Sequence, residues 1–92
     1  MKAPKTITPQ LVRQLYPCPG LYRSFCRSYP NGVAITEPNI IEWMNRFGAR
    51  SFEWFMQSLA GEKVAKQIHK KASGDNGLYA KHCMIWFEKQ WG

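Results

Sequence analysis

The sequence predicts an all-α fold, a compact single domain of five or six short helices over residues 1–92. Apolar residues recur at helical spacing along most of the chain, and proline, glycine or a capping residue bounds each such stretch. Large side chains are also plentiful, because 45% of the residues are hydrophobic and 14% are aromatic. We therefore expect one core that needs neither a metal ion nor disulfide bonds.

The first two helices are predicted from their boundaries. Residues 1–7 form a short basic lead that we expect to be flexible. Thr8 is a favourable N-cap, and Pro9 suits the first helical position, which needs no amide donor. The next helix covers about residues 19–28. It ends before residues 29–32 (Tyr-Pro-Asn-Gly), because proline interrupts the helical hydrogen bonds and Asn-Gly tolerates positive φ.

The middle of the chain predicts two more helices separated by a glycine. Residues 33–35 are expected to be extended at most. Thr36 is a favourable N-cap, and the helix behind it should run to about Phe47, where Gly48 can supply a left-handed cap. A further helix is expected over residues 52–60, starting from Ser51.

The last third of the chain is predicted to be helical again. One helix starts at Glu62, after Gly61, and residues 73–77 form the clearest loop in the sequence. A final helix follows. One side of it is expected to carry Leu78, His82, Ile85, Trp86 and Lys89. The predicted core takes apolar positions from every major helix and comprises Leu21, Phe25, Ile41, Met44, Phe55, Leu59, Ile68, Ile85 and Trp86.

The charge balance favours an acidic partner. The chain has 13 Lys and Arg against 6 Asp and Glu, a formal net charge of +7. Such an excess suits nucleic acid or the acidic face of a protein, and it also serves solubility. Three cysteines without framework spacing indicate a reduced chain. No apolar run reaches the length of a signal peptide or a membrane span, so we expect a cytoplasmic protein in its host cell, without membrane contact.

Metal and catalytic sites are not predicted. The possible metal ligands are Cys18, Cys26, His69, His82 and Cys83. None of them has the short paired spacing of structural zinc sites, and Cys26 and Cys83 are interpreted as small core residues. The only aspartate, Asp75, lies in a loop, and phosphate-binding or nucleophile motifs are absent. We therefore expect no cofactor and no enzymatic activity. A catalytic Cys/His pair that folding brings together stays as the alternative.

Basic and aromatic side chains are the candidates for partner contacts. The lysines of the fifth helical segment can neutralise phosphates without reading bases, or can form a solvated helix face. Residues 40–59 are similar to a helix-turn-helix, but the helix in the recognition position is too apolar and belongs in a core or a protein interface. Tryptophan and arginine dominate protein-binding hot spots. The predicted partner-binding residues are Arg23, Arg27, Arg50, Trp54, Lys63, Lys66, Lys70, Lys71 and Trp91. For Trp54 and Trp91, packing within this chain is the alternative.

A resemblance covers a little under half the chain. The residues that carry it are Cys18, Phe25, Tyr29, Pro30, Gly32, Val33, Ile35, Thr36, Asn39, Phe47, Gly48, Ala49, Phe52, Trp54, Phe55 and Leu59. This pattern resembles small uncharacterised accessory proteins of tailed phages and prophages, and the chain departs from it at the prolines that flank Cys18. The resemblance implies no reaction and no catalytic residues. It implies a protein that binds and modulates host machinery.

Two functions follow for such a chain. In the first, it is a non-enzymatic monomer or weak dimer that binds a host or phage protein, for example as an inhibitor of a host nuclease or defence complex. In the second, it is a basic nucleic-acid-binding module that uses residues 63–71 together with Arg23 and Arg27. We favour the protein partner, because the aromatic residues near these lysines resemble packing or interface groups more than base-stacking platforms.

Overall fold

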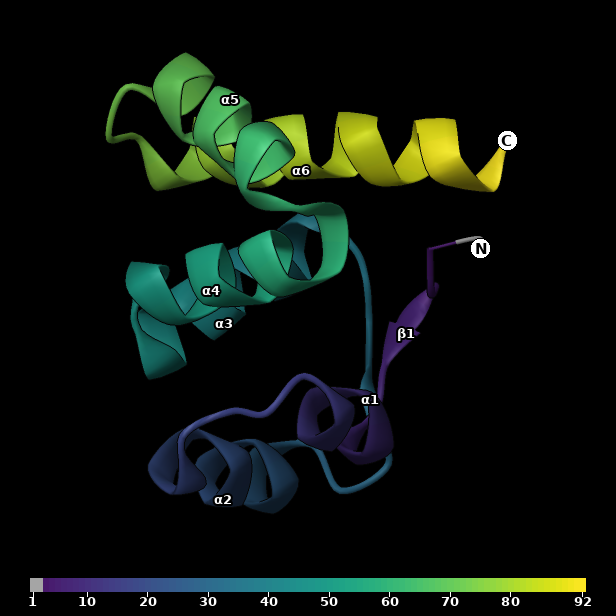
Figure 1. The fold of residues 1–92 in the computed structure, drawn as a ribbon. Helices are drawn as coiled ribbons and strands as arrows, with labels where there is room; N and C mark the ends of the chain where they lie inside the picture. The colour runs from purple at the N-terminus through teal and green to yellow at the C-terminus, as the bar shows by residue number, and fades with distance from the viewer. Residues whose placement is uncertain (1–2) are drawn as a thin grey trace.

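The computed structural model describes residues 3–92, and over that range six helices and two very short strands are present (Figure 1). In chain order the elements are β1 (Thr6–Ile7), α1 (Pro9–Gln14), α2 (Pro19–Ser28), β2 (Val33–Ala34), α3 (Glu37–Phe47), α4 (Ala49–Ala60), α5 (Glu62–Ala72) and α6 (Asn76–Trp91). The all-α class and the number of helices are confirmed.

The helices form three tiers along the molecule. α3 and α4 occupy the middle, α5 and α6 lie on one side of them, and α1 and α2 lie on the other (Figure 1). α6 packs against both α3 and α5, and α4 packs against α3 and α5. The central pair joins the two outer tiers, because Phe25 of α2 also packs against Trp43 of α3. Among residues 3–92, no helix combines the length and apolar character needed to cross a bilayer.

The N-terminal lead contains a strand pairing that the sequence did not predict. β1 pairs antiparallel with β2, and Ile7 is only 2% exposed. Gly32 makes this contact feasible: its φ is +89°, and a Cβ atom there would lie 2.9 Å from the Ile7 carbonyl oxygen. Residues 6–7 of the lead thus form a strand, the flexibility of the lead stays a prediction, and residues 1–2 lie outside the described part.

Several predicted helix boundaries are confirmed by their capping contacts. Thr8 Oγ1 accepts a hydrogen bond from the Leu11 amide at 3.1 Å, and Thr36 Oγ1 accepts one from the Asn39 amide at 3.3 Å. α6 begins inside the predicted loop, because Asp75 caps its first turn. α2 begins at Pro19, as predicted.

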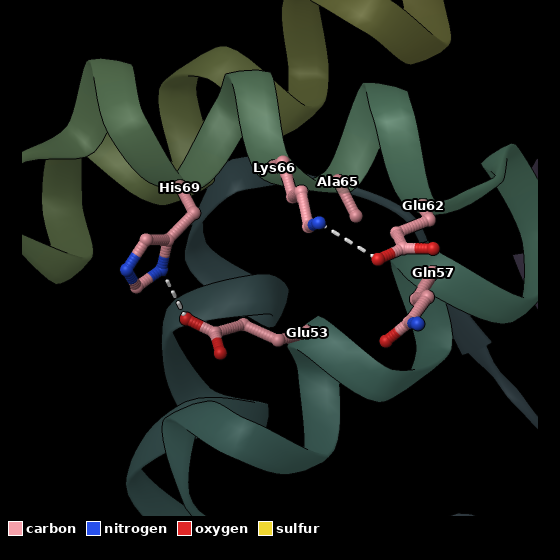
Figure 2. Close-up of a pocket in the computed structure, with 6 residues that line it drawn as sticks. All are labelled: Glu53, Gln57, Glu62, Ala65, Lys66 and His69. Carbon is pink, nitrogen blue, oxygen red and sulfur yellow. Dashed lines mark hydrogen bonds and ion pairs between the residues drawn. The ribbon is translucent and has the colours of Figure 1, made fainter.

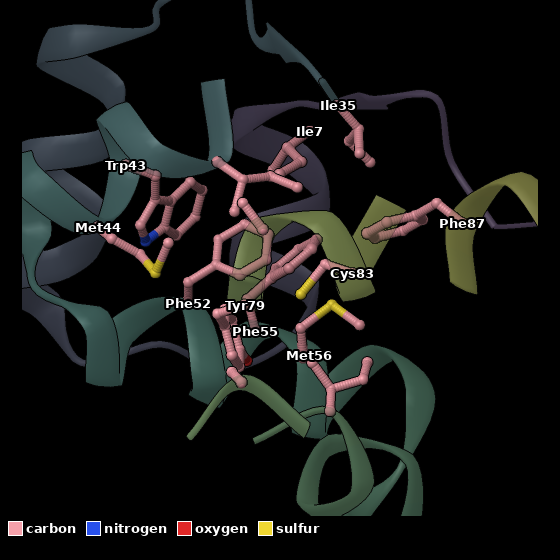
Figure 3. Packing of buried hydrophobic residues seen from close by; sticks show 14 of the residues in the cluster. Ile7, Ile35, Trp43, Met44, Phe52, Phe55, Met56, Tyr79, Cys83 and Phe87 are labelled. Atoms are coloured by element: carbon pink, nitrogen blue, oxygen red, sulfur yellow. The ribbon is translucent and has the colours of Figure 1, made fainter. Parts of the chain in front are cut away.

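Aromatic rings from α3, α4 and α6 lie together in the core (Figure 3), and Phe25 of α2 packs against them. Trp43 is 1% exposed, and its ring centroid lies 5.3 Å from that of Phe25, 5.3 Å from Phe52 and 5.7 Å from Phe55. The predicted core omitted Trp43. Four predicted core residues are buried, namely Phe25, Met44, Phe55 and Ile68. Four others are partly buried and pack against the core, namely Leu21, Ile41, Leu59 and Trp86.

The prediction for the last helix is wrong about which face is buried. Ile85, placed in the core by the sequence, is 42% exposed, and Leu78 on the same side is 41% exposed. The buried face consists of Tyr79, Ala80, Cys83 and Phe87. Because α6 has large apolar side chains on both faces, its spacing cannot select one of them, and packing against α3 and α5 makes the choice.

Candidate partner-binding groove

Two residues that the sequence predicted as partner contacts line one groove. Arg50 and Trp54 stand one turn apart on α4, where side chains at i and i+4 share a face. The groove between α2 and the α3–α4 corner has a volume of about 570 Å³. Its lining residues are Cys18, Gly20, Leu21, Ser24, Arg46, Phe47, Arg50, Ser51 and Trp54. We refer to it below as the Arg50–Trp54 groove.

The α3–α4 corner that positions this groove is held by a partly buried polar contact. Trp43 Nε1 donates a hydrogen bond to Ser51 Oγ at 2.7 Å, and that hydroxyl donates to the Gly48 carbonyl oxygen at 2.7 Å. Gly48 has a φ of +92°, which lets the chain turn directly from α3 into α4. The helix therefore begins at Ala49, earlier than predicted, with Ser51 inside its first turn.

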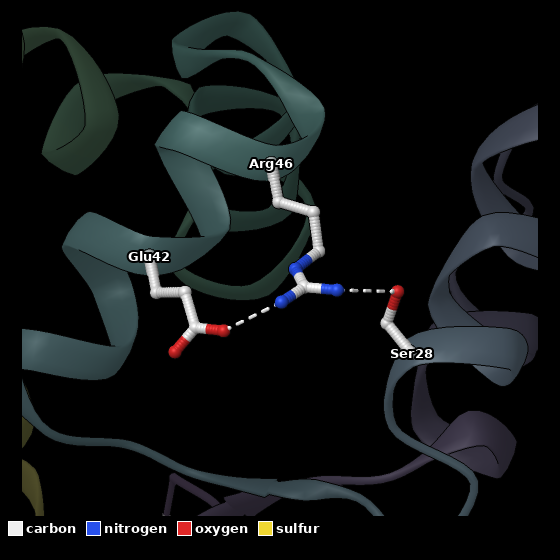
Figure 4. Close-up of polar contacts among 3 residues, drawn as sticks. All are labelled: Ser28, Glu42 and Arg46. Atoms are coloured by element: carbon white, nitrogen blue, oxygen red, sulfur yellow. Dashed lines mark hydrogen bonds and ion pairs between the residues drawn. The ribbon is translucent and has the colours of Figure 1, made fainter.

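Arg46 ties the two walls of the groove together (Figure 4). Its Nη2 donates to Glu42 Oε1 at 2.9 Å, and its Nη1 donates to Ser28 Oγ on α2 at 3.3 Å. The guanidinium also lies over the Tyr29 ring, 5.7 Å from its centroid. Burial, followed by the nearby Glu42 carboxylate, raises the pKa of Tyr29. Arg46 is thus a structural bridge as well as a lining residue.

Arg50 differs from Arg46 because, within residues 3–92, no carboxylate lies within ion-pair distance of its guanidinium. Its side chain is exposed, whereas Trp54 is half-buried and packs against the core. Phe47 and Leu21 add apolar surface beside them. The groove therefore offers an unpaired cation next to an apolar wall, a combination suited to a carboxylate and a large apolar side chain of a partner.

The remaining predicted contacts lie elsewhere. Arg23 and Arg27 are exposed on α2 but do not line the groove. All four predicted lysines of α5 are exposed, at positions 63, 66, 70 and 71. Lys66 Nζ pairs with Glu62 Oε1 at 2.8 Å, and Lys71 faces a second groove between α5 and α6. The four lysines thus differ in their surroundings and do not form one continuous row of unpaired charges.

Trp91 is docked within the chain. Its Nε1 donates to the carbonyl oxygens of Ala3 and Pro4 at 3.1 and 3.2 Å, and its ring stacks on Phe87 with the centroids 5.8 Å apart. Lys5 Nζ lies 5.9 Å from the centroid of the indole ring. The indole N–H is therefore occupied by this chain's own N-terminal lead and is not available to a partner.

A polar pocket that sequence reasoning missed lies between α4 and α5 (Figure 2). It has a volume of about 270 Å³ and is lined by Glu53, Gln57, Glu62, Ala65, Lys66 and His69. His69 Nδ1 lies 2.7 Å from Glu53 Oε1. These residues come from different helices, so their spacing in the sequence gives no signal. The lining has no serine, threonine or cysteine, and we assign no nucleophilic chemistry to it.

The candidate metal ligands are not gathered into a site. Within residues 3–92, no group of three or more His, Cys, Asp or Glu side chains is placed to hold a metal ion. Cys83 is buried, as interpreted from the sequence, and burial raises the pKa of its thiol to about 12. Cys26 is half-buried and Cys18 is exposed at the groove. Cys83 is consequently a neutral thiol at physiological pH.

The structure is that of a small all-α protein with a groove lined by two arginines and by apolar side chains. No protein-family model matches this chain, and neither a curated protein nor a solved structure does so.

Proposed function

We propose that this chain is a small non-enzymatic accessory protein, of phage or prophage type, that binds a host or phage protein in the host cytoplasm and inhibits or otherwise modulates it. The observation that carries the proposal is the shared groove of Arg50 and Trp54. Arginine and tryptophan are the residue types that most often dominate binding free energy at protein interfaces. The resemblance to phage accessory proteins supports the same class of function.

The chemistry of the groove narrows the partner to an acidic protein surface with a large apolar side chain. The charged residues in its lining are both arginines, and the whole chain carries a net charge of +7. Opposite charge would speed encounter and fix the orientation of the partner, while Trp54, Phe47 and Leu21 would supply apolar contact. Nucleic acid is favoured less, because Lys66 is paired with Glu62 and Lys71 faces a different groove.

The test is affinity capture from host lysate with and without nuclease, comparing the wild type with Arg50→Glu. Arg13→Glu is the matched control, because Arg13 is exposed on α1 and does not line the groove, yet the variant makes the same change in charge. A protein that survives nuclease, is lost with Arg50→Glu and is retained with Arg13→Glu supports the proposal. Capture that disappears with nuclease, or that is equal for both variants, contradicts it.

A further inference from the structure

The outward face of α6 carries two large apolar side chains that are partly exposed. Leu78 and Ile85 are 41% and 42% exposed and stand seven positions apart, so they lie on one side of this 16-residue helix. The opposite side of α6 is already buried in the core. A helix with apolar side chains on both faces is normally covered on both. Leu78 and Ile85 are therefore the two large apolar side chains of α6 that this chain leaves most exposed.

A groove runs beside this face, between α5 and α6. It has a volume of about 150 Å³, and its lining residues are Val64, Gln67, Ile68, Lys71, His82, Ile85, Trp86 and Lys89. Apolar side chains come from both helices. Lys71 stands on the α5 side and Lys89 on the α6 side, and no carboxylate lines the groove. The lining therefore combines apolar side chains from both helices with one lysine from each helix.

We propose that this α5–α6 groove and the adjoining outward face of α6 dock an amphipathic helix with acidic flanks, supplied by a partner protein. Apolar side chains of that helix would cover Ile85 and Leu78, and its carboxylates would meet Lys71 and Lys89. In helix-in-groove recognition the docking helix presents apolar anchors at i, i+3 or i+4 and i+7, and these would pack on the apolar side chains of α5 and α6.

Two other occupants fit the observations less well. A second copy of this chain would bring Lys71 and Lys89 of one protomer against the same charges of the other, and each copy has a net charge of +7. An anionic membrane would neutralise the lysines, but a flat bilayer surface does not place a side chain into a concave groove between two helices. The surface is separate from the Arg50–Trp54 groove, because the two share no lining residue.

The experiment is an NMR titration of the full chain with synthetic helical peptides. The probe is an amphipathic Glu/Leu peptide with leucines at i, i+3, i+4 and i+7. A Glu/Gln peptide of equal charge lacks the apolar stripe, and a Lys/Leu peptide reverses the charge. Saturable binding of the Glu/Leu peptide is expected, with amide shifts concentrated on α5 and α6. Ile85→Ser should weaken this binding about tenfold, because truncating an interface anchor often has that effect.

Charge is tested separately with the double variant Lys71→Glu/Lys89→Glu, which should also weaken binding of the Glu/Leu peptide and reduce its salt dependence. Arg13→Glu should leave the affinity within about twofold, since exposed charges far from a contact have little effect. Ile85 and both lysines are exposed, so circular dichroism should show the wild-type fold in every variant.

Four results would overturn the proposal. They are an absence of saturable Glu/Leu binding, equal affinity for the Glu/Gln peptide, amide shifts centred on the Arg50–Trp54 groove, and an Ile85→Ser variant that binds like the wild type. Sedimentation with phosphatidylserine vesicles that depends on Ile85, in the absence of peptide binding, would assign the surface to a membrane instead. Self-association lost in Ile85→Ser, again without peptide binding, would assign it to a second copy of the chain.

Discussion

The hydrogen bond between Trp43 and Ser51 should contribute measurably to stability, because it fixes the α3–α4 corner. Trp43→Phe removes the indole donor at 2.7 Å and part of a ring that is 1% exposed. The lost hydrogen bond should cost about 1 kcal/mol and the smaller ring about 1–2 kcal/mol. The sum, about 2–3 kcal/mol, is a large share of the ~5–15 kcal/mol expected for a domain of this size.

The matched change is Ser51→Ala, which leaves the partly buried indole N–H without its acceptor. We expect a loss of about 1 kcal/mol of unfolding free energy, because a fully buried unpaired donor costs about 1–3 kcal/mol and this one is only partly buried. In the double variant the second change finds the hydrogen bond already lost. The loss of unfolding free energy should therefore be smaller than the sum of the two single losses by about 1 kcal/mol.

Urea unfolding measures all three free energies, with an unchanged m-value as the sign that the denatured state is comparable. Effects of the two single changes that add to within about 0.3 kcal/mol would refute the reasoning, because the cycle then shows no coupling between the side chains.

Three further predictions test other parts of the structure. Gly32→Ala should cost about 1–3 kcal/mol of unfolding free energy in urea, since its Cβ would lie 2.9 Å from the Ile7 carbonyl oxygen at a φ of +89°. The folded-state pKa of Cys83, about 12, exceeds its ordinary value of 9.0, so the unfolded chain loses the thiol proton first. Unfolding free energy should therefore fall as pH rises from about 9 to 12, and Cys83→Ala should reduce that slope. Trp91→Phe removes the donor to the N-terminal lead, and hydrogen exchange at the Ile7 amide should become faster.

Local chemistry determines much of the fold. Thr8 and Thr36 are N-caps whose side-chain acceptors lie directly before apolar helical stretches, and the structure uses both as predicted. The β1–β2 pairing could not be predicted in this way, because strands of two residues have no periodicity to detect. Trp43 was missed for a related reason: its burial depends on rings from α2 and α4, which spacing within α3 does not reveal.

The candidate sites also depend partly on spacing within one helix, which the sequence reveals, and partly on packing between helices, which it does not. The i, i+4 spacing of Arg50 and Trp54 places them on one face of α4, and this much is readable from the sequence. That Leu21 of α2 stands opposite them depends on the turn at Gly48 and on the bridge from Arg46 to Ser28. The polar pocket between α4 and α5 depends on packing alone.

The two proposed surfaces have different physical origins. The Arg50–Trp54 groove is shaped by polar contacts, since the partly buried Trp43–Ser51 hydrogen bond and the exposed Arg46 bridge hold its walls. The α5–α6 surface arises because α6 carries apolar side chains on two faces and the core can cover only one of them. A groove whose walls are held by such hydrogen bonds should change little in backbone conformation on binding. The partly exposed side chains of Ile85 and Leu78 can instead change rotamer to fit the docking helix. The first surface is thus suited to a partner with a defined shape, and the second to a helix recognised by its apolar stripe and charge.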